Sequence, residues 1–183
     1  MGYATALSKS WFELEALAKD KKISLRFLSD EYCVDLENKR VMSLSCNTPL
    51  KDYLSILILH YLIQKLKGLP AISGEWVSFK QLAGGQGYYS AFKKRVIEPI
   101  MRKYGAHPES LLQAVQRYRA KRAQLADSSI VLDVCDNVLV LITLWHGDEE
   151  FGPEANVLFD KSIQDIFCTE DVVILAEFIA RSI

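Results

Sequence analysis

The stretch SIVLDVCDNVLVLITLW, residues 129–145, decides the fold class. In its first half, the side chains alternate with the period of two that is typical of a β-strand. Asp136 and Asn137 then supply a turn, and Val138 to Trp145 is almost continuously apolar. Because a continuously apolar strand is covered on both faces, the second half is predicted to be a central strand of a sheet.

Helical and strand patterns follow one another through the rest of the chain. Residues 50–67 are apolar around nearly the whole helix, which predicts a core helix buried on all sides. Pro99 predicts a break or a kink near Glu98 in the helix that ends at Tyr104. The other predicted elements are a helix at 8–20, a small antiparallel meander at 23–46, a helix at 108–126, a strand at 156–159 and a last helix capped by Thr169. These elements predict an α+β fold, a mixed or antiparallel sheet packed against several helices, in a single domain spanning residues 1–183.

Composition excludes several classes of protein. Of the 183 residues, 50% are hydrophobic and 25% charged, which rules out disorder, collagen-like repeats and a coiled-coil rod. The N-terminus lacks the apolar stretch of an export signal, and the longest apolar run, residues 53–63, is shorter than the about 20 residues that span a bilayer. No Cys-x-x-Cys pair occurs among the four cysteines. We therefore expect a cytoplasmic protein with reduced cysteines and no membrane contact.

Charge is unevenly spread along the chain. Residues 93–122 hold nine basic and two acidic residues, whereas residues 127–183 hold twelve acidic and two basic ones. A basic segment can bind an anion or a nucleic acid, lie against the acidic half, or be solvated. In the predicted helix at 108–126 the basic residues scatter around the circumference, and the net charge is −1. Nucleic-acid binding is therefore not favoured.

One candidate site lies at the end of the apolar strand. His146, Asp148 and Glu150 alternate there, so an extended backbone would place all three on one side. An imidazole and two carboxylates can hold a divalent metal ion or act as an acid–base pair. The structural alternative is an exposed acidic loop that follows a core strand.

A second candidate is a ligand pocket built from a glycine loop and aromatic side chains. Gly84 and Gly85 precede a predicted helix, where backbone amides attract anions, although glycines at such a position are also ordinary turn formers. The aromatic residues nearby can line a pocket for a flat ligand or simply form core. The predicted pocket residues are Trp76, Phe79, Gly84, Gly85, Tyr88 and Trp145.

Three separated motifs resemble a prokaryotic family known as domain of unknown function 3786, and the resemblance covers about residues 10–180. The first motif is Ile72-Ser73-Gly74-Glu75-Trp76-Val77-Ser78-Phe79-Lys80-Gln81-Leu82, followed by Gly85, Tyr88, Phe92 and Pro99. The second is Leu144-Trp145-His146-Gly147-Asp148-Glu149-Glu150-Phe151, followed by Ala155, Val157, Leu158, Phe159 and Asp160. The third is Thr169-Glu170-Asp171-Val172.

The resemblance carries no established activity. Members of that family occur largely in anaerobes, and some are fused to a cysteine-rich iron–sulfur domain similar to that of corrinoid iron–sulfur methyl-transfer proteins. This chain has no cysteine-rich segment and cannot hold such a cluster alone. The resemblance implies a non-catalytic ligand-binding or accessory module in anaerobic metabolism, with an iron–sulfur or corrinoid protein as partner. Two alternatives stay open: a metal-dependent enzyme using His146, Asp148 and Glu150, and a protein-interaction module that uses the charge asymmetry.

Overall fold

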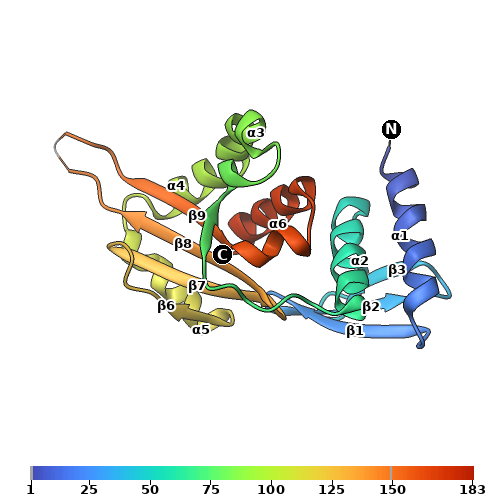
Figure 1. Ribbon diagram of the computed structural model, residues 1–183. Helices are drawn as coiled ribbons and strands as arrows, with labels where there is room; N and C mark the ends of the chain where they lie inside the picture. The colour runs from blue at the N-terminus through green and yellow to red at the C-terminus, as the bar shows by residue number, and fades with distance from the viewer. Residues whose placement is uncertain (1, 149) are drawn as a thin grey trace. The chain divides into compact units, whose positions relative to one another are not determined.

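The structure is a computed structural model that describes residues 2–148 and 150–183 (Figure 1). Its contacts divide the chain into two compact units, Met1–Pro70 and Ala71–Ile183. Each unit has its own antiparallel sheet and its own helices.

The first unit is a four-stranded antiparallel meander with two helices. Helices α1 and α2 lie side by side (Figure 1). The strands follow one another in the order β1-β2-β3-β4. The bounds are α1 Tyr3–Leu17, β1 Lys22–Phe27, β2 Asp30–Asp35, β3 Arg40–Ser43, β4 Thr48–Pro49 and α2 Asp52–Lys67.

Helix α2 forms the core of this first unit. Asp52 is favourably placed in its first turn, and Gly68, with φ of +110°, ends it. Its central residues, from Ser55 to Ile63, are buried except His60, which is partly exposed. The predicted helix at 50–67 and the predicted meander at 23–46 are both confirmed, and the first helix starts and ends earlier than predicted.

The second unit is built on a five-stranded antiparallel sheet with the order β5-β9-β8-β7-β6. Strands β7 and β8 are joined by a tight turn in which Asn137 has φ of +62°, a conformation that asparagine tolerates well. Residues 140–144 of β8 are all buried, and β8 lies in the middle of the sheet. The hairpin and the central strand predicted from residues 129–145 are therefore confirmed. The bounds are β5 Trp76–Ser78, β6 Ala120–Arg122, β7 Ser128–Cys135, β8 Val138–Trp145 and β9 Glu154–Asp160.

Helices connect and cover this sheet. Helix α4 contacts both α6 and β9, and the 3₁₀ helix η3 contacts β7. No helix in the described part of the chain is long and apolar enough to cross a bilayer. The bounds are η1 Phe79–Gln81, α3 Gly85–Phe92, η2 Lys93–Ile97, α4 Glu98–Tyr104, η3 Pro108–Gln113, α5 Ala114–Arg117, η4 Lys161–Asp165 and α6 Thr169–Ser182.

The α+β class with antiparallel sheets packed against helices is confirmed, with two sheets in place of one. The single domain over residues 1–183 stays a prediction beside the two compact units. The predicted cap of the last helix is wrong, because the Thr169 hydroxyl donates to the Ala83 carbonyl 2.7 Å away and the N-cap position falls on Cys168.

The helix predicted at 108–126 is also wrong. The segment begins as the 3₁₀ helix η3, makes one α-helical turn and becomes extended at Tyr118. Residues 120–122 then pair with residues 130–132 of β7 as an edge strand. Pairing with the edge of β7 provides hydrogen bonds for the backbone of residues 120–122. The stability gained from this pairing outweighs the helix propensity of the alanines, lysines and arginines in the segment.

Pro99 does not break the helical path that runs from Gly85 to Tyr104. Proline has no N–H to donate to the preceding turn, and here it stands in the first turn of α4. The preceding segment η2 is a π-helix, whose wider turn joins α3 to α4 without interruption. Of the predicted break or kink, the break is absent, and the helix is instead irregular in the π-helical turn directly before Glu98.

Thr143 on β8 provides a test of the core of this sheet. Its side chain is buried, and within the described residues its hydroxyl has no hydrogen-bond partner. Thr143→Val removes that unsatisfied group, so we expect the free energy of unfolding in urea to rise by about 1 kcal/mol. Ser129→Ala on the opposite position of β7 is the control: its hydroxyl donates to the Ala123 carbonyl at 2.7 Å, and its loss should destabilise the protein by about 1 kcal/mol. A loss of stability in Thr143→Val would contradict this interpretation of the core.

Candidate functional site

The predicted pocket residues lie at two different ends of the five-stranded sheet. Trp76 pairs with Asp160 at one end of β9, and Trp145 pairs with Glu154 at the other. Six residues of extended strand separate those two positions, which is about 20 Å. The prediction that Trp76 and Trp145 line one pocket is therefore wrong, because strand register places them apart.

Phe79 belongs to an aromatic core near Trp76. Its ring is fully buried and stacks on that of Phe92, with 4.2 Å between centroids. Phe92 in turn meets Phe159 edge-on at 6.4 Å and Tyr89 at 6.2 Å. This cluster joins the helix α3 to the strand β9, and stacked pairs of this kind add to core stability beyond their buried area.

Tyr88 faces away from that core. The side chain is 44% exposed, and its hydroxyl accepts a hydrogen bond from Arg95 at 3.0 Å. Arg95 also donates to Glu177 of α6 at 2.8 Å. Tyr88 therefore takes part in a polar contact between the α3–α4 helical segment and α6.

The glycine loop has a steric reason for its composition. Gly84 has φ of +73°, which disfavours other residues. A Cβ on Gly85 would lie 1.9 Å from the carbonyl oxygen of Phe79, so only glycine allows this close backbone approach. The Thr169 hydroxyl binds Ala83 in the same loop. These contacts give the two glycines a role in shaping the turn that starts α3.

Three glycine-to-alanine variants should give three different results in urea unfolding. Gly85→Ala should lose at least about 3 kcal/mol because its Cβ collides with backbone. Gly84→Ala should lose about 1 kcal/mol, since its φ is strained but the space is open. Gly87→Ala, inside helix α3 and in open space, should gain about 0.5–1 kcal/mol. Equal changes in the free energy of unfolding at the three positions would contradict these steric roles of the glycines.

A buried carboxylate, that of Asp160, organises the Trp76 end of the sheet. It is 1% exposed and accepts hydrogen bonds from the amides of Ser73, Gly74 and Ser162 at 2.8–3.0 Å. The hydroxyls of Ser73 and Ser162 also donate to it. Burial alone would raise the pKa of Asp160, but these hydrogen bonds outweigh burial and lower the pKa to about 2.

Asp160 should therefore govern acid stability. Its pKa is lower in the folded chain than the ordinary 3.8, so the stabilisation is present above pH 3.8 and is lost as the pH falls towards 2. The difference corresponds to about 2 kcal/mol. Asp160→Asn should lose at least that much at pH 7 in urea unfolding and should show a flatter stability profile between pH 4 and 2. Asp165→Asn, at an exposed position on η4, is the control and should behave like the wild type; an unchanged acid profile in Asp160→Asn would refute the assignment.

The opposite end of the sheet holds His146. Its amide donates to Asp127 at 2.8 Å, and its Nδ1 lies 3.2 Å from the same oxygen. Its Nε2 lies 3.6 Å from Glu109, which also lies 3.4 Å from His107. The hydrogen bond from the His146 amide lowers the pKa of the Asp127 carboxyl.

The predicted metal set of His146, Asp148 and Glu150 is not assembled. Asp148 turns its carboxylate to the amides of Glu150 and Phe151, at 2.9 and 2.7 Å, and these bonds lower its pKa. Among the residues that the structure describes, no three His, Cys, Asp or Glu side chains are arranged to hold a metal ion. The partners of His146 are carboxylates 19 and 37 positions earlier in the sequence, and no local motif could have indicated them.

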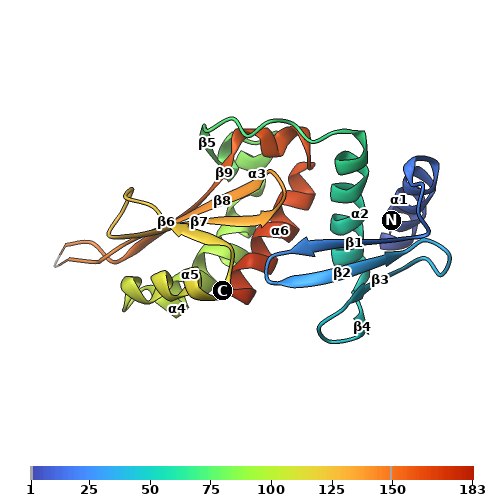
Figure 2. The same cartoon turned by 90° about the horizontal axis from the view of Figure 1, so that it is seen from below.

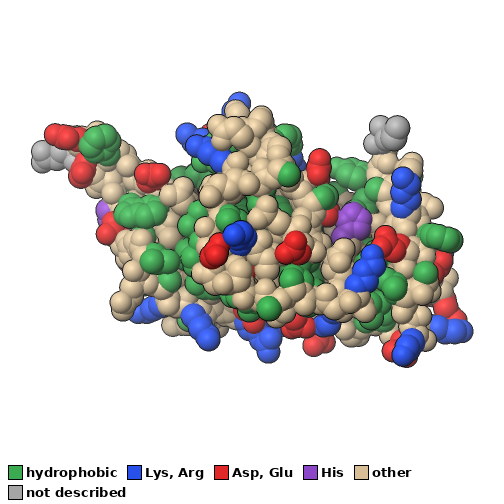
Figure 3. Space-filling model, in the orientation of Figure 1, with side chains coloured by type: hydrophobic (Ala, Val, Ile, Leu, Met, Phe, Trp, Pro, Cys, Tyr) green, Lys and Arg blue, Asp and Glu red, His purple; other side chains and the backbone are tan. Residues whose placement is uncertain are grey.

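Residues 146–153 join β8 to β9, and we name their described part, residues 146–148 and 150–153, the acidic hairpin tip. It contains Asp148 and Glu150 and no lysine or arginine. Figures 1 and 2 show this hairpin projecting away from the helices of the second unit, and Figure 3 shows acidic and apolar side chains gathered on the projection. A Cβ on Gly147 would lie 2.8 Å from the Pro153 nitrogen, so glycine lets the two arms approach closely.

Phe151 is the apolar side chain of this tip, and it is 70% exposed. Asp148 accepts from its amide at 2.7 Å, and the Asp148 amide donates to the Phe151 carbonyl at 2.8 Å. These two hydrogen bonds connect the backbone of Phe151 to Asp148. Phe151 is not among the site residues predicted from the sequence, although a lone phenylalanine in an acidic stretch is a signal that could have indicated it.

The geometry defines an α+β protein in which the motif at residues 72–82 pairs with the one at 155–160, and Thr169 of the third motif reaches Ala83. The family model described as Domain of unknown function (DUF3786) matches residues 12–182. The chain therefore belongs to the DUF3786 family. No curated protein and no solved structure matches it.

Proposed function

We propose that this chain is a non-catalytic accessory module of the cytoplasm that binds a partner protein through the acidic hairpin tip. The observation that carries the proposal is Phe151, a large apolar side chain that is 70% exposed on a backbone held by Asp148. Exposed aromatic side chains of this kind are the usual anchors of protein interfaces. The hydrogen bonds to Asp148 restrict the backbone of Phe151, which reduces the entropy lost on binding.

Charge indicates the kind of partner. The acidic residues around Phe151 complement a surface with an apolar pocket rimmed by lysine or arginine. The family resemblance, with its link to cysteine-rich iron–sulfur domains, favours an iron–sulfur or corrinoid protein of anaerobic metabolism as that partner. A metal-dependent enzyme is disfavoured, because the Asp148 carboxylate already accepts hydrogen bonds from the amides of Glu150 and Phe151.

A photoreactive benzoylphenylalanine at position 151, in cells that naturally express the chain, tests the proposal. We expect a covalent adduct with one protein on illumination, and less adduct when Asp148→Ala releases the turn. The same label at exposed Gln164 on η4 is the control. A yield at position 151 no higher than at position 164 would refute the proposed function.

With the captured protein in hand, Phe151→Ala should weaken binding by about 2 kcal/mol, roughly 30-fold, as for an interface anchor. Phe12→Ala is the matched control, since Phe12 is also exposed, at 76%, but belongs to α1. It should leave the affinity for that partner unchanged. Isothermal titration calorimetry at two salt concentrations measures both effects, and affinity should fall with added salt because the attraction is partly electrostatic.

A further inference from the structure

The outer edge of strand β6 exposes backbone hydrogen-bonding groups. Strand β6 pairs with β7 and forms one edge of the five-stranded sheet (Figure 1). Its bonds to β7 use alternate residues: the Arg119 carbonyl accepts an amide of β7 at 2.8 Å, and the Ala123 amide donates to a carbonyl of β7 at 2.9 Å. Because bonded and non-bonded positions alternate in an antiparallel ladder, the amides and carbonyls of Ala120 and Arg122 point away from β7. These groups can bond to an additional strand.

The side chains along this edge are basic. Arg119 and Lys121 are two positions apart and lie on one face of the sheet, and Arg122 lies on the other. All three side chains are exposed. Arg119 lies 3.9 Å from Asp133, whereas Lys121 and Arg122 have no ion-pair partner within the part of the chain that the structure describes. The edge therefore carries positive charge that no acidic side chain there compensates.

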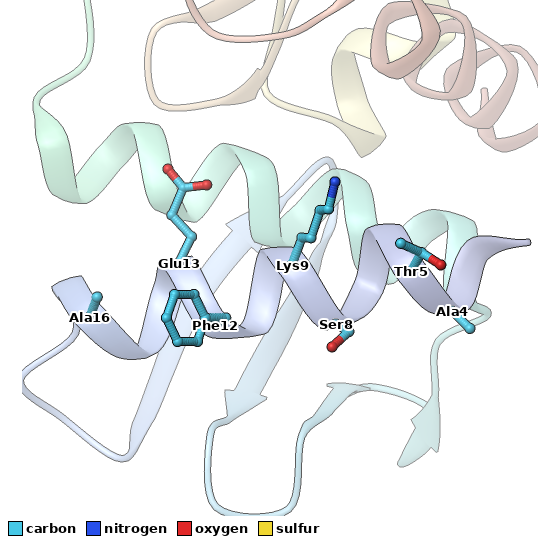
Figure 4. Close-up of a pocket in the computed structure, with 7 residues that line it drawn as sticks. All are labelled: Ala4, Thr5, Ser8, Lys9, Phe12, Glu13 and Ala16. Carbon is cyan, nitrogen blue, oxygen red and sulfur yellow. The ribbon is translucent and has the colours of Figure 1, made fainter. Parts of the chain in front are cut away.

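The outer face of helix α1 differs in this respect. Phe12 is exposed there beside Lys9 and Glu13 (Figure 4). Glu13 pairs with Lys67 of α2 at 2.6 Å, so that face carries charge of both signs, part of which is compensated within the chain. At the β6 edge the unpaired charge has a single sign, and it favours a partner of the opposite sign.

Two other occupants fit this edge less well. A second copy that paired β6 with β6 would bring like charges together, which is a usual protection of edge strands against self-association. A nucleic acid without a paired strand binds best where its bases can stack on exposed rings. Tyr118 precedes the edge, but its hydroxyl donates to the Ser182 carbonyl, and Arg117 lies over its ring at 5.7 Å. An acidic strand meets neither obstacle.

We propose that the edge of β6 accepts an acidic, extended segment of another protein, which joins the sheet as an additional strand. Main-chain hydrogen bonds to Ala120 and Arg122 hold the segment, as in other complexes formed by strand addition. The residue opposite Lys121 forms a non-hydrogen-bonded pair, in which side chains lie closest, so a carboxylate there meets the lysine ammonium. A carboxylate two positions along the segment lies on the same face, opposite Arg119. The segment therefore carries acidic residues at alternate positions.

The probe that tests the proposal is a short peptide in which glutamate alternates with threonine, titrated up to 1 mM into the full chain labelled with nitrogen-15. We expect saturable binding, with the largest shifts at the amides of Ala120 and Arg122, because these amides gain hydrogen bonds. Lys121→Glu should weaken binding at least tenfold. Ala120→Pro should abolish binding, since proline removes an outward amide without loss of a bond to β7. Lys94→Glu makes the same charge change on the exposed surface of η2 and should bind like the wild type.

Two methylated peptides separate the ladder from the charge. Methyl groups on the threonine amides, which face β6 in the proposed register, should abolish binding. Methyl groups on the glutamate amides, which point away from β6, should leave binding intact. Both peptides keep the full charge, so equal binding of the two would show that charge alone acts and would overturn the proposal.

Four further results would overturn it. The first is no saturable binding of the unmodified peptide below 1 mM. The second is an Ala120→Pro variant that keeps both the wild-type thermal unfolding curve and the wild-type affinity. The third is a single-stranded oligonucleotide that binds the edge more tightly than the peptide does. The fourth is self-association of the chain that Ala120→Pro abolishes, which would assign the edge to a second copy.

Discussion

The second unit depends on one buried carboxylate. Asp160 ends strand β9, and its donors come from segments on either side of it in space: Ser73 and Gly74 before β5, and Ser162 after β9. Strand β5 has only three residues and lies at the edge of the sheet, so few ladder hydrogen bonds hold it. The carboxylate binds Ser73 and Gly74 directly before β5, and the Lys161–Glu75 ion pair at 2.8 Å adds a further contact there.

The position of β5 fixes the start of helix α3. Phe79 follows β5 directly, and its ring packs in the aromatic core. Its carbonyl oxygen lies so close to Gly85, where α3 begins, that a Cβ on Gly85 would collide with it. Features that look like a binding motif in the sequence, glycines beside aromatic residues, thus serve packing at this end of the sheet. The acidic hairpin tip lies at the other end, where β8 and β9 leave the sheet.

The two surfaces with an exposed phenylalanine belong to different units and differ in kind. The acidic hairpin tip carries charge of one sign around Phe151, which suits a partner of opposite charge. Helix α1 carries one residue of each sign beside Phe12, Lys9 and Glu13, and Glu13 is paired with Lys67 of α2.

Local patterns in the sequence determined the fold class and most of the elements. The alternation in residues 129–135, the apolar run after it and the all-round apolar helix at 50–67 each indicate their burial directly, because side-chain periodicity is a property of the local backbone. The meander and the strand at 156–159 were predictable for the same reason. The error at residues 108–126 arose where tertiary pairing with β7 overrode local propensity.

Only the tertiary structure decided which side chains meet. Strand register placed Trp76 and Trp145 about 20 Å apart. The fold brought His146 close to Asp127 and Glu109. The Asp148 carboxylate accepts a hydrogen bond from the amide of Phe151. Most of these outcomes depend on contacts between residues far apart in the chain, and a single sequence carries no local record of them. The residues of most segments therefore indicated whether the segment is a helix or a strand. Which side chains lie together at each end of the sheet followed from the register of the strands.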